Sequence, residues 1–150
     1  MKLKKVGVLK LNQQFTTNDK IASVSLFGLG ALEFSRGFYW LIYQRAVLSE
    51  SEFYAALHEV MPIWLWGLIL AMFGLMIMLS SVFYGKRDVS KKSSYFMMIG
   101  GFGASIIQFL MVAASLYNSI NILSPVQFTI LTGWLILVSF LGGVDIYGKR

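Results

Sequence analysis

The sequence predicts an all-α, polytopic membrane protein with four transmembrane helices, and its composition and apolar segments carry that prediction. Of the 150 residues, 57% are hydrophobic and only 13% are charged, a balance far from that of a soluble domain. A helix rises about 1.5 Å per residue and the hydrocarbon core is about 30 Å thick, so each crossing needs roughly 20 apolar residues. Four segments qualify, and together they make residues 1–150 a single membrane domain: 21–43, 62–84, 95–117 and 126–147.

The positions of the basic residues predict the orientation. All but two of the 13 Lys and Arg residues lie on one side of the predicted spans, the exceptions being Arg36 and Arg45. The Lys and Arg residues on that side precede the first span, follow the second within 86–92, or end the chain. Because Lys and Arg in short loops stay inside, we expect both termini in the cytoplasm and the chain in the cell membrane, which in a bacterium is the cytoplasmic membrane.

Residues 1–20 form a basic tail that we expect to be cytoplasmic. The run Thr16-Thr17-Asn18-Asp19 supplies side-chain acceptors for the free N–H groups of a starting helix, so the first helix should begin within two residues of Asp19. The apolar stretch that follows is too long for the core of a signal peptide. We therefore interpret 21–43 as a retained first span.

The segment between the first two spans predicts a short interfacial helix on the outer side. Ser49 and Glu52 have the spacing of a capping box. Apolar residues then recur at helical spacing, which is typical of an amphipathic helix lying in the interface. Pro62 is expected as the first residue of the second span. The apolar face would hold Phe53, Leu57, Val60 and Met61, and the water-facing side Glu50, Glu52, His58 and Glu59.

The two halves of the chain show signs of a repeat. Residues 62–87 and 125–150 have the same length, and both run from Pro to Tyr-Gly-Lys-Arg. Gly28-Leu29-Gly30-Ala31 also resembles Gly101-Phe102-Gly103-Ala104. A turn of about seven residues after Asn118 would join the third and fourth spans. These features predict two αα-hairpins related as a parallel pseudo-repeat, with chance resemblance as the alternative.

Glycines on the first and third spans predict how the helices pack. Lipid gives no hydrophobic drive for helix association, so close contact at small residues must supply it. We expect the first and third spans to cross closely and the second and fourth to face lipid. The glycines either pack the monomer or form an oligomer seam or pore lining; they are Gly28, Gly30, Gly100, Gly101 and Gly103.

Polar residues inside the spans form the candidate site. Glu33 and Arg36 have the i,i+3 spacing that allows pairing along one helix, and Gln108 on the third span has a similar depth. Ser35, and Ser139 on the fourth span, could extend this intramembrane polar layer. Charged residues at mid-bilayer cost about 3 kcal/mol on insertion scales and are functional-site candidates. The layer is either a satisfied structural network or a site for a proton or cation. Asp145 is expected as an interfacial partner of Lys149.

The sequence offers no enzyme signature. It contains no cysteine and one histidine, His58, so neither thiolate chemistry nor a histidine metal site can be built. We expect no catalytic residues, no cofactor and no metal. The net charge of +6 is accounted for by contact with anionic lipid headgroups rather than with nucleic acid.

Three kinds of non-enzymatic function remain open. The first is a self-associating pore or lesion former, holin-like in architecture alone. The second is a small channel or transporter that uses the layer around Glu33. The third is an accessory or assembly subunit, or an immunity factor, of a larger membrane complex. The expected partners are accordingly the lipid bilayer and either further copies of the chain or another membrane protein.

Overall fold

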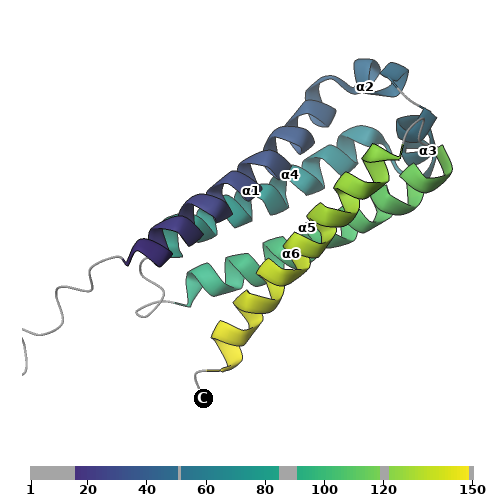
Figure 1. Cartoon of the computed structure of the whole chain (residues 1–150). Helices are drawn as coiled ribbons and strands as arrows, with labels where there is room; N and C mark the ends of the chain where they lie inside the picture. Colours follow the sequence, from purple (N-terminus) through teal and green to yellow (C-terminus); the bar gives the residue numbers. More distant parts are fainter. Residues whose placement is uncertain (1–15, 51, 85–90, 119–121, 149–150) are drawn as a thin grey trace, which may run out of the picture.

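The computed structural model describes residues 16–50, 52–84, 91–118 and 122–148, and within them it is all-helical, with six helices and no strand. Four helices are long, and two short ones lie together at one end of the bundle (Figure 1). The Lys and Arg residues within 1–15, 86–87 and 149–150, which enter the predicted orientation, lie outside the described residues. The helices are α1 (Thr17–Ile42), α2 (Gln44–Glu50), α3 (Glu52–Val60), α4 (Ile63–Tyr84), α5 (Lys92–Asn118) and α6 (Leu123–Tyr147).

Three of the long helices are long and apolar enough to cross a membrane: α4, α6 and the stretch Lys92–Tyr117 of α5. The helix α1 has 26 residues but is less apolar, because it carries Glu33 and Arg36. The chain is therefore a helical protein with the character of a multi-pass membrane protein.

The start of α1 agrees with the sequence prediction. Thr16 is the N-cap, and its side chain accepts a hydrogen bond of 3.2 Å from the backbone N–H of Asp19. The Asp19 carboxylate in turn accepts a 3.1 Å bond from the backbone N–H of Thr16. This reciprocal capping box satisfies two free donors at the helix start, so α1 begins where its polar residues predict.

The predicted capping box at Ser49 is wrong. Ser49 lies inside α2, a helix that the sequence analysis does not anticipate, and its hydroxyl donates 2.7 Å to the carbonyl of Ala46 one turn earlier. A hydroxyl inside a helix commonly bonds back to its own backbone in this way. Ser51 and the side chain of Glu50 lie outside the described part of the chain.

The predicted helix after this point is present as α3, with Leu57 buried and Glu52 and Glu59 exposed. Its apolar face is shorter than expected, since Val60 is 81% exposed. His58 is half-exposed and so only partly solvated, because its Nδ1 accepts a 3.1 Å hydrogen bond from the backbone N–H of Ile63 at the start of α4. The side chain of Phe53 is outside the described part.

Two element boundaries differ from the prediction. Pro62 precedes α4 instead of opening it, and its carbonyl accepts a 2.9 Å bond from the N–H of Leu65. Pro125 is the third residue of α6, where the missing N–H of proline costs nothing because first-turn donors have no helical partner. The connection between α5 and α6 is therefore shorter than the predicted seven residues.

The long helices make their extensive contacts in the order α1 with α4, α4 with α5, and α5 with α6. The prediction that the first and third spans cross closely is wrong, since the backbone of α1 meets α4 instead. A Cβ built on Gly30 would lie 2.8 Å from the carbonyl oxygen of Gly74, and one on Gly37 would lie 2.5 Å from that of Gly67. Small residues on both helices let the two backbones approach. Consequently α4 lies between α1 and α5 but keeps one exposed apolar face, on which Met72 is 57% and Val82 is 67% exposed.

The glycines of α5 serve two different contacts. Gly100 and Gly103 face Phe73 of α4, and a Cβ on Gly103 would overlap the ring of Phe73. Gly101 faces α6, where a Cβ would lie 2.9 Å from both the carbonyl oxygen of Leu135 and the N–H of Ser139. Gly28, which the sequence comparison aligns with Gly101, has nothing within 4 Å. Glycines at matching positions of the two halves therefore have different surroundings.

Candidate functional site

A buried polar pair lies between α1 and α5. Glu33 and Gln108 are both 0% exposed, and Gln108 Nε2 donates a 2.6 Å hydrogen bond to Glu33 Oε2. The structure thus brings together two side chains that the sequence analysis places at similar depth. This bond matters for the architecture because α1 and α5 share no extensive backbone contact.

The local packing explains why these polar side chains point inward. In α1, Glu33 belongs to a buried stripe with Gly30, Gly37 and Trp40, which recurs every three to four residues. Gly30 and Gly37 seat α1 on α4, and the same helix face then directs Glu33 into the bundle. In α5, Gln108 follows the buried Ala104 and Ile107 on the inner face. Glycine packing therefore fixes the direction of the carboxyl group.

Arg36 does not form the predicted ion pair with Glu33. Its guanidinium carbon lies 5.3 Å from the centroid of the Phe128 ring of α6, and no salt bridge joins it to the Glu33 carboxylate. A guanidinium within about 6 Å of an aromatic face is held by a cation–π interaction. Arg36 thus contacts α6 while Glu33 contacts α5, and this division corrects the pairing that the i,i+3 spacing predicts.

Three buried atoms of these side chains have no hydrogen-bond partner among the described residues: Glu33 Oε1, Gln108 Oε1 and Arg36 Nη1. An unmet buried polar group costs about 1–3 kcal/mol, and such groups call for a specific explanation. Direct contacts between the described side chains therefore leave the cluster only partly hydrogen-bonded. It keeps two acceptors and one donor available.

The other predicted members of the layer lie elsewhere. Ser35 is on the exposed side of α1 and donates 3.0 Å to the carbonyl of Leu32 in its own helix. Ser139 donates 2.9 Å to the carbonyl of Met98, which ties α6 to α5. Lys149, the expected partner of Asp145, is outside the described residues. The cluster consists of Glu33, Gln108 and Arg36.

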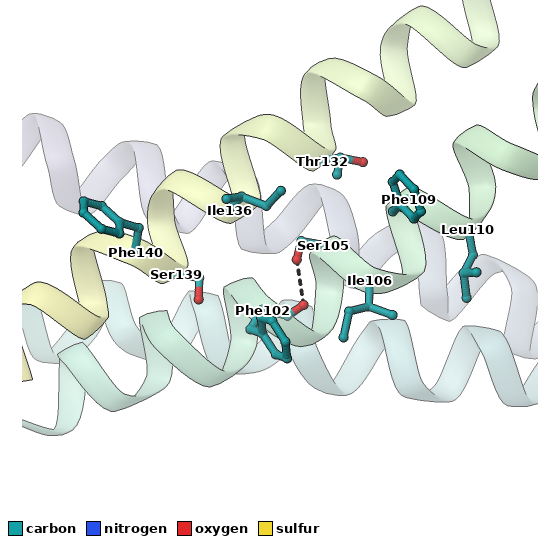
Figure 2. Close-up of a pocket in the computed structure, with 9 residues that line it drawn as sticks. All are labelled: Phe102, Ser105, Ile106, Phe109, Leu110, Thr132, Ile136, Ser139 and Phe140. Carbon is teal, nitrogen blue, oxygen red and sulfur yellow. Dashed lines mark hydrogen bonds between the residues drawn. The ribbon is translucent and has the colours of Figure 1, made fainter.

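A separate apolar groove of about 470 Å³ lies between α5 and α6 (Figure 2). Its hydroxyl groups already donate to backbone carbonyls; Ser105, for example, donates 2.7 Å to Phe102, and Thr132 donates 2.7 Å to Phe128. The groove therefore offers apolar contact and no free polar group of its own lining. Its remaining lining residues are Ile106, Phe109, Leu110, Ile136, Ser139 and Phe140.

The described residues contain no group of three or more His, Cys, Asp or Glu side chains that could hold a metal ion. Of these residue types, the buried cluster contributes a single carboxylate, Glu33. The side chains of the cluster offer hydrogen bonding and charge.

Sequence reasoning missed Phe128 and the glycines Gly37, Gly67 and Gly74. Phe128 gives no signal, because one aromatic residue on an apolar helix looks like any other. The glycines do give a signal, because α1 carries Gly30 and Gly37 and α4 carries Gly67 and Gly74, each pair seven residues apart. This heptad spacing is typical of one packed helix face.

The fold and the cluster define a class, a small helical protein of membrane character with a polar core site. No protein-family model, curated protein or solved structure matches the chain. Its function has therefore to be inferred from the geometry.

Proposed function

We propose that the chain is a non-enzymatic integral membrane protein with four spans that acts by self-association, as a holin-like pore or lesion former. In this proposal α1 also crosses the membrane, as a further span beside α4, α5 and α6. Its 26 residues, at about 1.5 Å each, exceed the roughly 30 Å of the hydrocarbon core. Two charged residues lie in the central turns of α1. Glu33 contacts α5 and Arg36 contacts α6, so neither needs to meet lipid.

Two unpacked glycines carry the proposal. Gly28 and Gly133 are the only glycines in the described residues whose added Cβ would meet nothing within 4 Å. They lie on α1 and α6, the two long helices that each make extensive contact with only one other long helix. Glycine on a membrane helix favours close approach of another helix. These surfaces suit a further copy of the chain.

Such contacts would pair two different helices, α1 of one copy with α6 of the next. Head-to-tail contacts of this kind produce rings when the rotation closes. A ring of copies within the membrane is the arrangement that a pore requires.

A potential-sensitive dye tests the proposal in cells that express the chain. We expect wild-type expression to collapse the membrane potential, and Gly28→Leu and Gly133→Leu to delay the collapse and weaken the oligomer in mild detergent. Val24→Leu, at a site 72% exposed on the same helix as Gly28, is the matched control. An intact potential at high expression, or a monomer in mild detergent, would contradict the proposal. Co-purification of a different membrane protein would favour an accessory role.

Orientation can be tested on the same chain because it contains no cysteine. A single cysteine at Lys20 should resist a membrane-impermeant thiol reagent in intact cells, and one at Ser49 should react. Labelling of Lys20→Cys from outside would refute the cytoplasmic N-terminus.

A second candidate function is a small channel or transporter, and the unpartnered atoms of Glu33, Gln108 and Arg36 favour it. Ionisable groups inside membrane helices commonly mark ion or proton paths. Glu33→Gln should then alter proton-dependent flux in reconstituted vesicles. Unchanged flux would remove this candidate.

A further inference from the structure

We propose that Glu33 and Gln108 form a reversible proton-binding site, in which the protonated Glu33 side chain and the Gln108 amide make a doubly hydrogen-bonded acid–amide pair. The ligand is a single proton from the aqueous phase. This inference does not depend on pore formation, because it concerns a contact within one copy of the chain.

The hydrogen-bond pattern supplies the first argument. Gln108 Nε2 donates to Glu33 Oε2, which leaves one oxygen on each group, and both of these oxygens lack a partner. A carboxylate oxygen and an amide oxygen are both acceptors, so they cannot bond to each other. A proton on Glu33 Oε1 turns that atom into a donor, and Gln108 Oε1 is the acceptor it requires.

The balance of the step is simple. One proton leaves water and binds Glu33 Oε1, the carboxylate changes from −1 to neutral, and no other covalent bond forms or breaks. Two unmet acceptors become one O–H···O hydrogen bond. The net charge of the cluster changes from zero to the single positive charge of Arg36.

The position of Arg36 supplies the second argument. An ionised Glu33 would attract the guanidinium one turn away, yet Arg36 lies over the Phe128 ring and forms no salt bridge with Glu33. The cation–π contact stabilises the arginine charge without the carboxylate. The arrangement is thus suited to a neutral glutamic acid.

Arg36 is also the one charged neighbour of Glu33 on the helices packed around it, within the described residues. The titratable and charged side chains of α4, α5 and α6 all lie in terminal turns, and the remaining ones of α1 are Asp19 and Lys20 at its start and Tyr39 beyond Arg36. Those of the other three helices are Tyr84, Lys92, Tyr95, Tyr117, Asp145 and Tyr147. Proton uptake and release at this site therefore reflect the Glu33 carboxyl group in its contact with Gln108.

Binding of the proton changes the link between α1 and α5. The helices α1 and α5 share no extensive contact, so the Glu33–Gln108 pair is a principal link between them. With the proton bound, the link has two hydrogen bonds; without it, the link has one bond and two acceptor oxygens that lack partners. The site therefore couples proton binding to the joining of α1 with α5.

Infrared spectroscopy of the full chain in lipid vesicles, recorded across pH, tests the proposal. We expect a carbonyl band of a protonated carboxylic acid at neutral pH that is lost in Glu33→Gln and kept in the control Glu59→Gln, which alters an exposed glutamate of α3. In Gln108→Leu the band should shift or disappear, because its hydrogen-bond partner is gone. Absence of the band in the wild type at neutral pH, or a band unchanged in Gln108→Leu, would overturn the proposal.

A second measurement separates this proposal from a merely structural role of Glu33. Glutamine at position 33 can make the same two hydrogen bonds without a proton, so Glu33→Gln should fold. The thermal midpoint of the wild type should fall as pH rises, because the folded chain binds a proton that the unfolded chain does not, and that of Glu33→Gln should lose this dependence. Equal pH profiles would count against the proton site. The infrared band should persist in a monomeric Gly28→Leu variant, which separates this site from failure of the pore.

Discussion

The helix pair α1–α4 and the helix pair α5–α6 are both antiparallel, but they are packed in different ways. In α1–α4, glycines on both helices face each other, Gly30 with Gly74 and Gly37 with Gly67. In α5–α6, a glycine of one helix faces larger residues of the other: Gly101 meets Leu135 and Ser139, and Gly142 meets Ser94 and Met98. The α5–α6 pair also borders an open apolar groove of about 470 Å³.

This difference shows what sets helix contact in an apolar solvent. Leucine and isoleucine gain little by leaving lipid, so bulk apolarity does not choose a partner. Facing glycines do, because they let backbone atoms come into dispersion contact. A pair with glycine on both sides closes along its length, whereas a pair with glycine on one side leaves room elsewhere.

The largest effect should come from blocking the α1–α4 contact. Gly37→Leu would place side-chain atoms into the backbone of Gly67 and Ala71, since even its Cβ would lie 2.5 Å from each. Because neither backbone can yield cheaply, we expect a loss of about 3 kcal/mol or more in the free energy of unfolding. Unfolding in mixed detergent measures this. Val24→Leu, at a site of α1 that is 72% exposed, is the control, and an equal loss in both variants would refute the packing argument.

The second effect concerns the link between α1 and α5. Glu33→Leu would leave the buried amide of Gln108 without its partner, at a cost of about 1–3 kcal/mol. Glu33→Gln keeps both hydrogen bonds and should cost under about 1 kcal/mol. The same unfolding assay at neutral pH compares the two. A Leu variant as stable as the Gln variant would show that the buried bond does not stabilise the bundle.

A smaller effect is expected in the α5–α6 pair. Gly101→Ala would place a Cβ 2.9 Å from the backbone of Leu135 and Ser139. We expect a loss of about 1 kcal/mol. Gly37→Ala should cost more, because its Cβ would lie only 2.5 Å from the backbone of Gly67 and Ala71. If Gly101→Ala proves the more harmful, the comparison of the two pairs fails.

The smallest effect should come from the groove. Ile106 lines it and is 47% exposed, so Ile106→Ala removes a side chain that lipid can replace, with a change within about 0.5 kcal/mol. Ile77 is 0% exposed on the inner side of α4, and Ile77→Ala should cost about 2–5 kcal/mol. Equal losses in the unfolding assay would mean that the groove is part of the packed core.

The sequence predicts the long helices well because each is an apolar run of membrane length bounded by polar residues. The start of α1 is predicted from Thr16 and Asp19, and the contact of Glu33 with Gln108 from their depths alone. The first prediction uses the local chemistry of a helix cap, and the second uses distance along the helix axis, which 1.5 Å per residue converts directly into position.

Partner choice is predicted poorly because it depends on rotation about the helix axis. The sequence analysis pairs the first and third spans from a cluster of glycines, without asking which helix faces hold glycine on both sides. Arg36 illustrates the same limit: its spacing from Glu33 allows a pair, but Phe128, which decides its position, is distant in the chain and carries no distinctive pattern. The helix α2 was missed because its seven residues contain no repeat of apolar periodicity.

The two helix pairs meet through the extensive contact of α4 with α5, and the buried Glu33–Gln108 contact in addition joins α1 to α5. A double-mutant cycle of Glu33→Leu and Gln108→Leu, read by unfolding in mixed detergent, tests this link of α1 with α5 most directly. Because the two side chains contact each other, we expect a coupling free energy of about 0.6 kcal/mol or more. Additive losses, within about 0.3 kcal/mol, would contradict it.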